Sequence, residues 1–547
     1  MVRQSPEQIA FPELTPQQME QVAAIGERHE FQAGDILVRA GQRDYSFWVV
    51  EQGHVDIMDP TSESPRLVAQ HPPNTFVGDI DILTGRPAVI SAVCRTDGAA
   101  YQITGKQVRR MLQEIPEFSD LLLESFQMRR QLLEAGGFQG LRVFGTPFSQ
   151  ETLRLREFFH RNHVPHTFLD VNDESASRQL HALGIQDDEI PVVACNFSQT
   201  VNKRPSLSKV AECIGITRKI DDRLYDLVVV GAGPAGLTAA IYAASEGLQT
   251  LVVDRVGPGG QAGSSSRIEN FIGFPSGISG SELANRAYIQ ALKFGAHFTA
   301  PINVLSVDGS VPGEHRLELC TGAVARTKCL LVASGVSYRQ LDLEGCQRLE
   351  GAGVYYAATT VEARVCRNAP VVVVGGGNSA GQAAMYLADH ARDVKLVIRG
   401  ESLAKGMSAY LSRRVMNHPR IELIANSEIE KVNGDCGVES VSVHSALTDE
   451  RTTLDCQGLF IFIGARPHTD WLPSTVRLDE KGFIDTGAAL QNDERWPLQR
   501  APFDLETTAP GILAAGDVRS GTTKRCGFAV GDGSLAVTCV HRYLNQG

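Results

Sequence analysis

A glycine-rich turn near the middle of the chain constrains the fold more than any other feature of the sequence. An apolar, β-branched run at 227–230 leads into the G-x-G-x-x-G pattern of Gly231, Gly233 and Gly236, and an Ala-rich helical pattern follows at once. A strand, a tight turn and a helix in this order are typical of a site for the pyrophosphate of a dinucleotide. The glycines let the pyrophosphate approach the backbone closely, and the N–H groups of the helix N-terminus bind it. The next predicted strand ends in Asp254, which is placed to bind a ribose hydroxyl. The alternative is a Gly-rich turn in an ordinary α/β domain.

Length, charge and cysteine usage narrow the class of protein. A chain of 547 residues is too long for one core, so we expect about three or four domains. The net charge of -11 and the pI near 5.7 argue against a nucleic-acid partner. No apolar run reaches membrane-spanning length, and the N-terminus does not resemble a signal peptide. The eleven cysteines include no C-x-x-C, which predicts reduced thiols in the cytoplasm and no metal site.

A second glycine pattern indicates a second dinucleotide site. The apolar run at 371–374 leads into a turn at 375–380, a helical pattern follows, and the next predicted strand ends in Arg399. An acid at that position would favour NADH, whereas a cation favours the 2′-phosphate of NADPH. We therefore expect NADPH, with NADH as the alternative.

Two dinucleotide folds, the second inserted in the first, resemble the low-molecular-weight thioredoxin reductase family over residues 224–547. Besides the glycine turns, the resemblance is carried by Gly259-Gly260-Gln261 and by Ala514-Ala515-Gly516-Asp517-Val518. It implies FAD, a pyridine nucleotide and a homodimer. It also implies two Rossmann-type α/β domains, each of three layers: an FAD-binding domain at 221–345 and 465–547, and an NAD(P)H-binding domain at 346–464.

The resemblance and the spacing together predict two sets of cofactor-binding residues. The FAD site comprises Gly231, Gly233, Pro234, Ala235, Gly236, Asp254, Gly260, Gln261, Asn270, Gly335, Gly516, Asp517, Lys524, Arg525 and Cys526. The NAD(P)H site comprises Gly375, Gly377, Asn378, Ser379, Ala380, Arg399 and Lys405.

The sequence departs from this family where the family carries its redox-active C-x-x-C. The family's cysteines align with Ala357 and Thr360. Hydride transfer from nicotinamide to flavin needs only the two cofactors, but passing electrons on to a disulfide needs a thiolate. Thr360, Arg525 and Cys526 are the residues expected near the flavin, and Lys524 or Arg525 would stabilise the charge of the reduced ring. Cys526 is more simply read as a small buried residue.

Three functions remain open on these residues. The leading one is an FAD-dependent NAD(P)H oxidoreductase that passes electrons directly to a quinone, a ferredoxin-like protein, a thioredoxin-like protein or oxygen. The second is a thioredoxin-disulfide reductase that uses other thiols. The third is a flavin-based redox or ligand sensor.

The N-terminal part, residues 1–137, predicts a β-roll between helices. A helix is expected at 15–29, short alternating strands with Gly-containing turns at 31–103, and helices from 105 to 135. Phe31-x-x-Gly34-Asp35, Gly53-x-Val55-x-Ile57 and the segment 76–87 resemble the cyclic-nucleotide-binding domain family. Asp79 matches the family's ribose-binding acid, but Ala88 stands where its phosphate-binding Arg would be. Binding of a cyclic nucleotide is therefore disfavoured, and the alternative is a roll kept for dimerisation or docking.

Residues 138–220 resemble the glutaredoxin and thioredoxin fold. Strands are expected at 141–144 and 166–171, with a helix at 153–162 between them, and Pro191 matches that family's cis-proline. The family's two redox cysteines align with Ser149 and Thr152, and a hydroxyl does not replace a thiolate. We therefore expect a redox-inactive domain that serves as a spacer or docking module, with a peptide or thiol ligand as the alternative.

Overall fold

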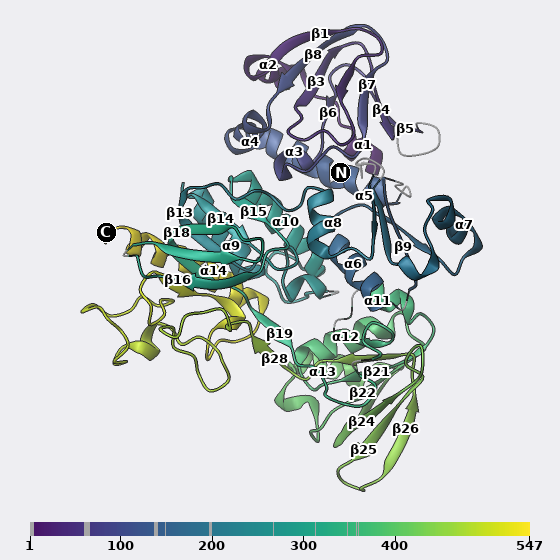
Figure 1. Ribbon diagram of the computed structural model, residues 1–547, viewed down its shortest axis with the longest axis vertical. Helices are drawn as coiled ribbons and strands as arrows, with labels where there is room; N and C mark the ends of the chain where they lie inside the picture. The colour runs from purple at the N-terminus through teal and green to yellow at the C-terminus, as the bar shows by residue number, and fades with distance from the viewer. Residues whose placement is uncertain are drawn as a thin grey trace. The chain divides into compact units, whose positions relative to one another are not determined.

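The structure is a computed structural model that describes residues 5–59, 66–135, 140–147, 149–195, 200–265, 267–311, 313–346, 348–356, 358 and 360–546. The chain folds into two compact units. Unit 1 comprises Met1–Thr146, Asn162–Lys219 and Ile289–Pro301. Unit 2 comprises Pro147–Arg161, Ile220–Tyr288 and Ile302–Gly547. Figure 1 labels many of the elements of both.

The N-terminal part of unit 1 is a roll of two antiparallel sheets with helices before and after them. One sheet has the order β1-β8-β3-β6 and the other β2-β7-β4-β5. The core includes the rings of Phe47 and Phe76, which are tilted toward each other, and the ring of Phe126, which meets both of them edge to face. The elements are α1 (Pro6–Ala10), α2 (Pro16–Ile25), β1 (Glu27–Phe31), β2 (Ile36–Val38), β3 (Phe47–Gln52), β4 (Val55–Asp59), β5 (Arg66–His71), β6 (Phe76–Val77), α3 (Asp81–Thr84), β7 (Ser91–Cys94), β8 (Gly98–Ile103), α4 (Gly105–Glu114) and α5 (Pro116–Ala135).

The helix expected at 15–29 is shorter than predicted. Thr15 caps its start in a capping box with Gln18, as the sequence pattern favours. The helix ends at Ile25, however, and Glu27–Phe31 pairs with β8 as a strand. The polar residues of this segment carry no strong local preference, so pairing with β8 decides their conformation.

The remaining part of unit 1 holds a mixed sheet of order β10-β9-β11-β12. Strands β9 and β10 are parallel, and β11 runs antiparallel to β9. Phe144, Leu180 and Val192 lie in its core. The Ile190–Pro191 peptide bond is cis. The elements are β9 (Leu141–Gly145), β10 (Thr167–Asp170), α7 (Glu174–Ala182), η1 (Asp187–Glu189), β11 (Val192–Cys195), β12 (Thr200–Lys203) and α8 (Leu207–Cys213). The separate segment Ile289–Pro301 of unit 1 carries β15 (His297–Thr299), which is not a strand of this sheet.

Unit 2 contains a largely parallel sheet around the first glycine turn. Strands β14, β13, β18 and β29 are parallel, and β17 and β16 continue the sheet antiparallel beyond β18. Helices α9 and α14 pack so closely that a Cβ on Gly533 would lie 2.3 Å from the Ala235 carbonyl oxygen. The elements are β13 (Leu224–Val230), α9 (Pro234–Ser245), β14 (Thr250–Val253), η2 (Ala262–Ser264), α10 (Gly280–Lys293), β16 (Val304–Asp308), β17 (His315–Leu319), β18 (Val324–Val332), η4 (Gly487–Leu490), β29 (Ile512–Ala514), η5 (Gly516–Val518) and α14 (Cys526–Leu544).

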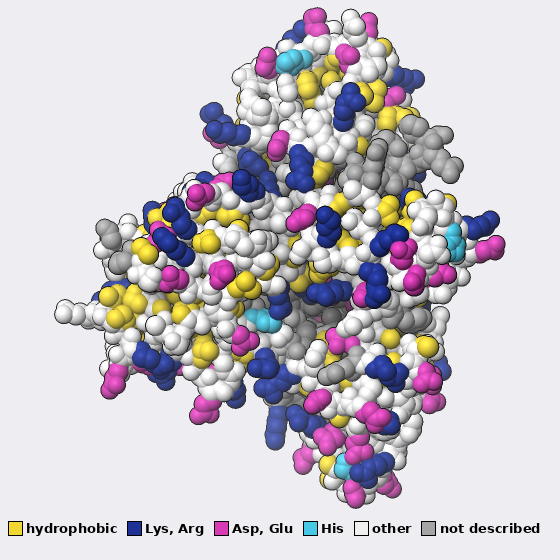
Figure 2. Space-filling view, viewed as in Figure 1, with side chains coloured by type: hydrophobic (Ala, Val, Ile, Leu, Met, Phe, Trp, Pro, Cys, Tyr) yellow, Lys and Arg dark blue, Asp and Glu magenta, His cyan; other side chains and the backbone are white. Residues whose placement is uncertain are grey.

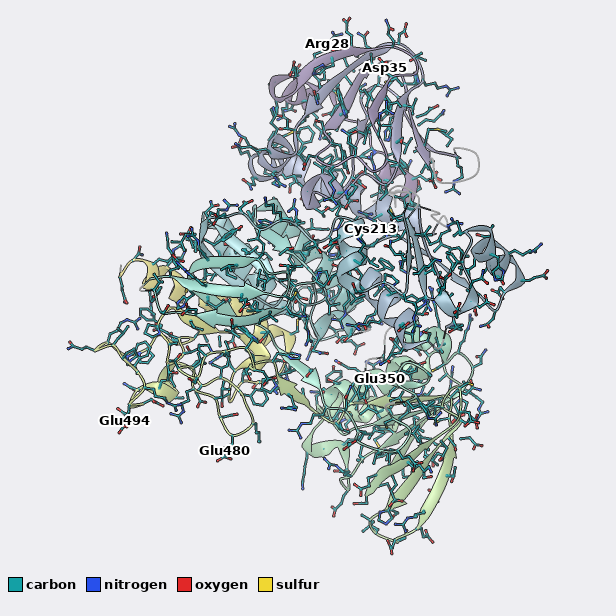
Figure 3. The ribbon with its side chains drawn as sticks, in the orientation of Figure 1. Arg28, Asp35, Cys213, Glu350, Glu480 and Glu494 are labelled. Carbon is teal, nitrogen blue, oxygen red and sulfur yellow. The ribbon has the colours of Figure 1, made fainter. Side chains whose placement is uncertain are left out.

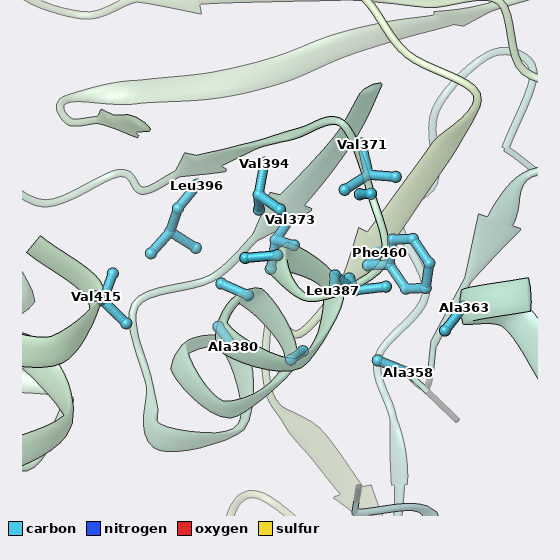
Figure 4. Packing of buried hydrophobic residues seen from close by; sticks show 14 of the residues in the cluster. Ala358, Ala363, Val371, Val373, Ala380, Leu387, Val394, Leu396, Val415 and Phe460 are labelled. Atoms are coloured by element: carbon cyan, nitrogen blue, oxygen red, sulfur yellow. The ribbon is translucent and has the colours of Figure 1, made fainter. Parts of the chain in front are cut away.

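A second parallel sheet, of order β20-β27-β21-β22-β23, surrounds the second glycine turn. Both faces of β21 are buried, as its Val-rich sequence favours. Figure 4 shows one of the faces, where Ala380 and Leu387 lie beside Val373 and Phe460. The elements are β20 (Val354–Tyr355), α11 (Thr360–Val365), β21 (Pro370–Val374), α12 (Asn378–Ala388), β22 (Asp393–Val397), η3 (Leu403–Lys405), α13 (Ala409–Met416), β23 (Ile421–Ile424) and β27 (Gly458–Ile461).

Two smaller pieces complete unit 2. An antiparallel sheet is formed by β24 (Ser427–Asn433), β25 (Ser440–Ser445) and β26 (Arg451–Asp455). A short antiparallel pair, β19 (Val336–Tyr338) with β28 (Ala465–Pro467), marks the passage of the chain into and out of the second sheet. Helix α6 (Gln150–Arg161) also belongs to this unit.

Candidate functional site

The first glycine turn has the geometry that a close-approach site requires. Gly231 has φ +109°, and a Cβ there would lie 2.2 Å from the Ala333 carbonyl oxygen. A Cβ on Gly236 would lie 1.9 Å from the Gly231 carbonyl oxygen, so helix α9 packs directly on the turn. Around Gly233, by contrast, the nearest atom to an added Cβ is 3.8 Å away. The middle glycine is therefore the one that leaves open space over the helix N-terminus.

Asp254 follows β14 and holds this turn in place. One of its carboxylate oxygens accepts a hydrogen bond from the Ala232 N–H at 2.7 Å. The other accepts from the N–H groups of Val256 and Gly257, each at 2.8 Å. A carboxylate has about four acceptor sites, so these three bonds leave capacity for one further donor.

A cavity of about 1020 Å³ brings both glycine turns together within unit 2. Most of the predicted residues line it: Gly231, Gly233, Pro234, Ala235, Asp254, Gly260, Gln261, Asn270, Gly335, Gly377, Asn378, Ser379, Ala380, Gly516, Asp517, Lys524, Arg525 and Cys526. Gly236 and Gly375 are outside this lining. A Cβ on Gly375 would lie 2.4 Å from the Phe462 carbonyl oxygen, so both of these glycines permit close packing of the backbone.

Arg399 and Lys405 do not line the cavity, although the sequence predicts them in the nucleotide site. Both side chains are exposed, Arg399 just after β22 and Lys405 in η3. The loop that carries Lys405 packs over the second glycine turn, because a Cβ on Gly406 would lie 2.7 Å from the Gly376 carbonyl oxygen. Asn378 fixes the end of this loop by accepting a hydrogen bond from the Ser408 N–H at 2.8 Å.

Charged groups and one thiol meet where η5 and α14 line the cavity. Burial raises the pKa of Asp517, and the Lys524 ammonium acts in the opposite direction. Burial and the Asp517 carboxylate together raise the pKa of Cys526 to about 11. Cys526 is therefore a neutral thiol at physiological pH and a poor nucleophile. The Lys524 Nζ lies 3.9 Å from the centre of the Phe483 ring.

Cys526 is the one cysteine among the described residues that line the cavity. Ala357 lies outside the described residues. Thr360 begins α11, and its side chain is not among those that the structure describes. Tyr355 and Tyr356 pack into the two cores on either side of the second sheet.

The sequence did not point to several residues of the lining. Arg161 comes from α6, far from either glycine turn in the sequence, and carries no motif. Gln382 and Tyr410 follow the second turn on α12 and α13. His468 and Trp471 follow β28, and burial, together with nearby Arg255, lowers the pKa of His468. Only the fold brings these segments together.

In the N-terminal roll, the polar groups around α3 bond to other parts of unit 1. The Tyr45 hydroxyl donates to the Asp79 carboxylate at 2.5 Å. The guanidinium of Arg130, on α5, pairs with the buried Asp81 carboxylate at 2.8 Å. Arg86 is buried and donates to the Asn162 carbonyl oxygen at 2.9 Å. Ala88, which stands at the phosphate-binding position, is also buried.

Comparison with known proteins identifies the family. Residues 225–533 match the pyridine nucleotide-disulphide oxidoreductases, and residues 28–115 match the cyclic nucleotide-binding domain. The chain belongs to the pyridine nucleotide-disulphide oxidoreductase family. It is therefore an oxidoreductase-family protein with an N-terminal cyclic nucleotide-binding domain.

Thioredoxin reductases are among its relatives. The chain is 31% identical to "Thioredoxin reductase" of Bacillus subtilis over 327 residues, which are 60% of this chain and 96% of that protein. It is 31% identical over 324 residues to "34.2 kDa protein in rubredoxin operon" of Clostridium pasteurianum, covering 59% of this chain and 98% of that protein. The crystal structure of Lactococcus lactis thioredoxin reductase matches 59% of this chain and all of its own length, with 29% identity and a TM-score of 0.53.

The described part of the chain lacks the features of two other classes of site. None of its helices has the length and hydropathy to cross a membrane. Within the same residues, His, Cys, Asp and Glu side chains form no group of three or more that could hold a metal ion. Figure 2 shows Lys and Arg interspersed with Asp and Glu over the visible face.

Proposed function

We propose that the chain is an FAD-dependent NAD(P)H oxidoreductase that passes electrons from reduced flavin directly to an acceptor. The observation that carries the proposal is the single cavity lined by both glycine turns, in which the described residues include one cysteine and no pair. The domain boundaries that accompany it are 1–137, 138–220, 221–345 with 465–547, and 346–464.

The residues around the first glycine turn fit FAD. Gly233 leaves open backbone at the start of α9, and an added Cβ on Gly335 would meet no atom within 4 Å. A pyrophosphate at that helix N-terminus receives N–H hydrogen bonds and a favourable dipole. Asp254 retains an acceptor site for a ribose hydroxyl. When bound, FAD supplies the hydride-accepting and electron-passing chemistry.

The groups at the start of α14 fit the other end of the cofactor. Lys524 and Arg525 offer positive charge where a reduced flavin ring carries negative charge. Asp517 offers a carboxylate to a hydroxyl of the ribityl chain. Cys526, whose pKa is about 11, contributes a neutral side chain, so it does not relay electrons as a thiolate.

The second glycine turn supports an NAD(P)H site, and we propose NADPH, with NADH as the alternative. Arg399 and Lys405 are exposed cations on the two sides of the loop that follows β22. A guanidinium and an ammonium suit a 2′-phosphate, which carries charge that a ribose hydroxyl lacks.

The acceptor is a quinone, a ferredoxin-like protein, a thioredoxin-like protein or oxygen, and the assay that separates them also tests the proposal. NADPH oxidation is measured with each acceptor for the wild type and for the double variant Ala357→Cys with Thr360→Cys. We expect the wild type to turn over with at least one non-disulfide acceptor and to show no thioredoxin-dependent disulfide reduction above background. Disulfide reduction by the wild type would establish a thioredoxin-disulfide reductase instead. Very slow turnover with every acceptor would favour the flavin-based sensor.

A homodimer in the cytoplasm is also part of the proposal. Sedimentation of the purified protein tests the dimer, and fractionation of the producing cell tests the location.

A further inference from the structure

Helix α6 lies against the segment that the family uses for its redox cysteines. Gln150 at the start of α6 contacts Gly351, where an added Cβ would be 2.8 Å from the Gln150 Cα. Leu153, one turn further along, packs against the core cluster that contains Ala358 and Ala363. Figure 1 shows α6 beside α11, and Figure 3 labels Glu350, the residue before Gly351.

Charged groups continue this contact along α6. Arg156 is one turn beyond Leu153, so the two side chains share a face of the helix. Burial lowers the pKa of Arg156, Arg364 lowers it further, and Glu362 raises it. Both of these neighbours lie on α11. On this side of α6 the Leu153 and Arg156 side chains are half-buried, the Gln150 side chain is exposed, and the contact extends over the first two turns of the helix.

The start of α6 is also where the thioredoxin fold keeps its dithiol. Here Ser149 caps the helix, since its hydroxyl accepts a hydrogen bond from the Thr152 N–H at 3.4 Å. The Thr152 side chain is fully buried, and its hydroxyl has no hydrogen-bond partner among the described residues. Disulfide exchange requires the sulfurs of both proteins to meet, so a thioredoxin-type partner must bring this helix end to the reductase's own dithiol segment.

We propose that α6 is a built-in occupant of the surface formed by residues 350–356 and 360–366, and that it closes this surface to a separate thioredoxin-fold protein. The chain then carries both sides of a contact between a reductase and a thioredoxin. The four positions where the two families have their redox cysteines carry a hydroxyl or a methyl group instead, at Ser149, Thr152, Ala357 and Thr360. The opposite end of α6 reaches the cavity, which Arg161 lines. This inference concerns which partner is excluded, and it holds whether or not the cavity binds FAD.

Engineered cysteines test the contact in solution. In the pair Gln150→Cys with Gly351→Cys the two Cβ positions are 3.2 Å apart, and the backbone at Gly351 (φ +81°) must shift by a few tenths of an ångström to carry the new side chain. Mild oxidation of the full-length protein is followed by peptide mass spectrometry. We expect the joined peptide at a level at least about tenfold above either single variant, because the docked helix gives a high effective concentration. Circular dichroism and thermal unfolding show whether each variant folds. A folded pair that joins no more than the single variants do would overturn the proposal.

Two further cross-linking experiments test whether α6 stays bound to this surface. Leu153→Asp puts a carboxylate into the apolar contact and should lower the cross-link yield about tenfold, whereas Arg154→Asp, on an exposed position of the same helix, should leave it unchanged. Oxidation in the presence of excess added thioredoxin should also leave the yield unchanged. A fall in yield with thioredoxin, or equal yields for the two Asp variants, would show that α6 is not the occupant.

Discussion

Replacing the glycines of the first turn one at a time separates cofactor binding from packing. Gly233 has φ −74°, a conformation open to any L-residue, and its added Cβ would meet no protein atom closer than 3.8 Å. Gly233→Ala should therefore fold, at a cost of up to about 1 kcal/mol for a poorer N-cap. The new methyl group occupies cavity space over the helix N-terminus. Overpacking of about 1–3 kcal/mol against a bound pyrophosphate corresponds to a roughly 5- to 150-fold weaker FAD affinity.

Gly236→Ala is the matched variant, because its methyl group meets protein instead of the cavity. The added Cβ would lie 1.9 Å from the Gly231 carbonyl oxygen, whereas ordinary contact begins at 3.4 Å, so α9 must move by about 1.5 Å. We expect the apoprotein to lose about 3 kcal/mol or more of stability.

The assay measures each property separately. Thermal unfolding of the apoproteins by circular dichroism gives stability, and quenching of FAD fluorescence on titration gives affinity. Gly233→Ala should lose affinity with little loss of stability, and Gly236→Ala should lose stability. If Gly233→Ala binds FAD as tightly as the wild type, the pyrophosphate does not lie on this turn and the assignment of the site is wrong.

Three further predictions follow from charges and burial. Because the pKa of Cys526 is about 11, its alkylation at pH 8 should be roughly 100-fold slower than that of an ordinary thiol of pKa 9, and the rate should rise with pH. Peptide mass spectrometry measures the rate, with labelling of the exposed Cys436 for comparison, and rapid labelling of Cys526 at pH 8 would show that it is a thiolate. Arg399→Ala should raise the KM for NADPH by roughly 3- to 10-fold and leave that for NADH unchanged, and an equal effect on both would remove Arg399 from the 2′-phosphate site. Asp81→Ala removes the carboxylate that pairs with the buried Arg130 guanidinium, and should lower the free energy of unfolding of the roll, measured by calorimetry, by about 3–5 kcal/mol. The double variant Asp81→Ala with Arg130→Met should recover much of this loss, because it leaves no buried charge.

Local signals in the sequence predicted the parts of the site that depend on local structure. The strand–turn–helix units at Gly231 and Gly375 form as expected, because the apolar strands, the glycines and the Ala-rich helices are adjacent in the chain. The end of the first helix was predicted wrongly, since pairing of Glu27–Phe31 with β8 is a long-range interaction. The roles assigned to the individual cofactor-binding residues stay predictions.

Long-range contacts account for what sequence reasoning missed. Nothing in the spacing of α6 places Leu153 against the core cluster that contains Ala380 and Phe460, or Arg161 at the cavity. The carboxylate of Asp79, predicted for a ribose, already accepts a hydrogen bond from Tyr45, which lies on another segment of the roll. Such contacts depend on the final packing of the fold, and periodicity and motif spacing carry no information about that packing.

Anaerobic titration of the purified protein with NADPH tests the central claim most directly. A flavin that receives electrons without a dithiol should lose its visible absorbance after one equivalent of NADPH per FAD, with no long-wavelength thiolate–flavin band. The variant with Ala357→Cys and Thr360→Cys should take up a second equivalent. A colourless protein that does not bind added FAD, or a wild type that consumes two equivalents, would contradict the account.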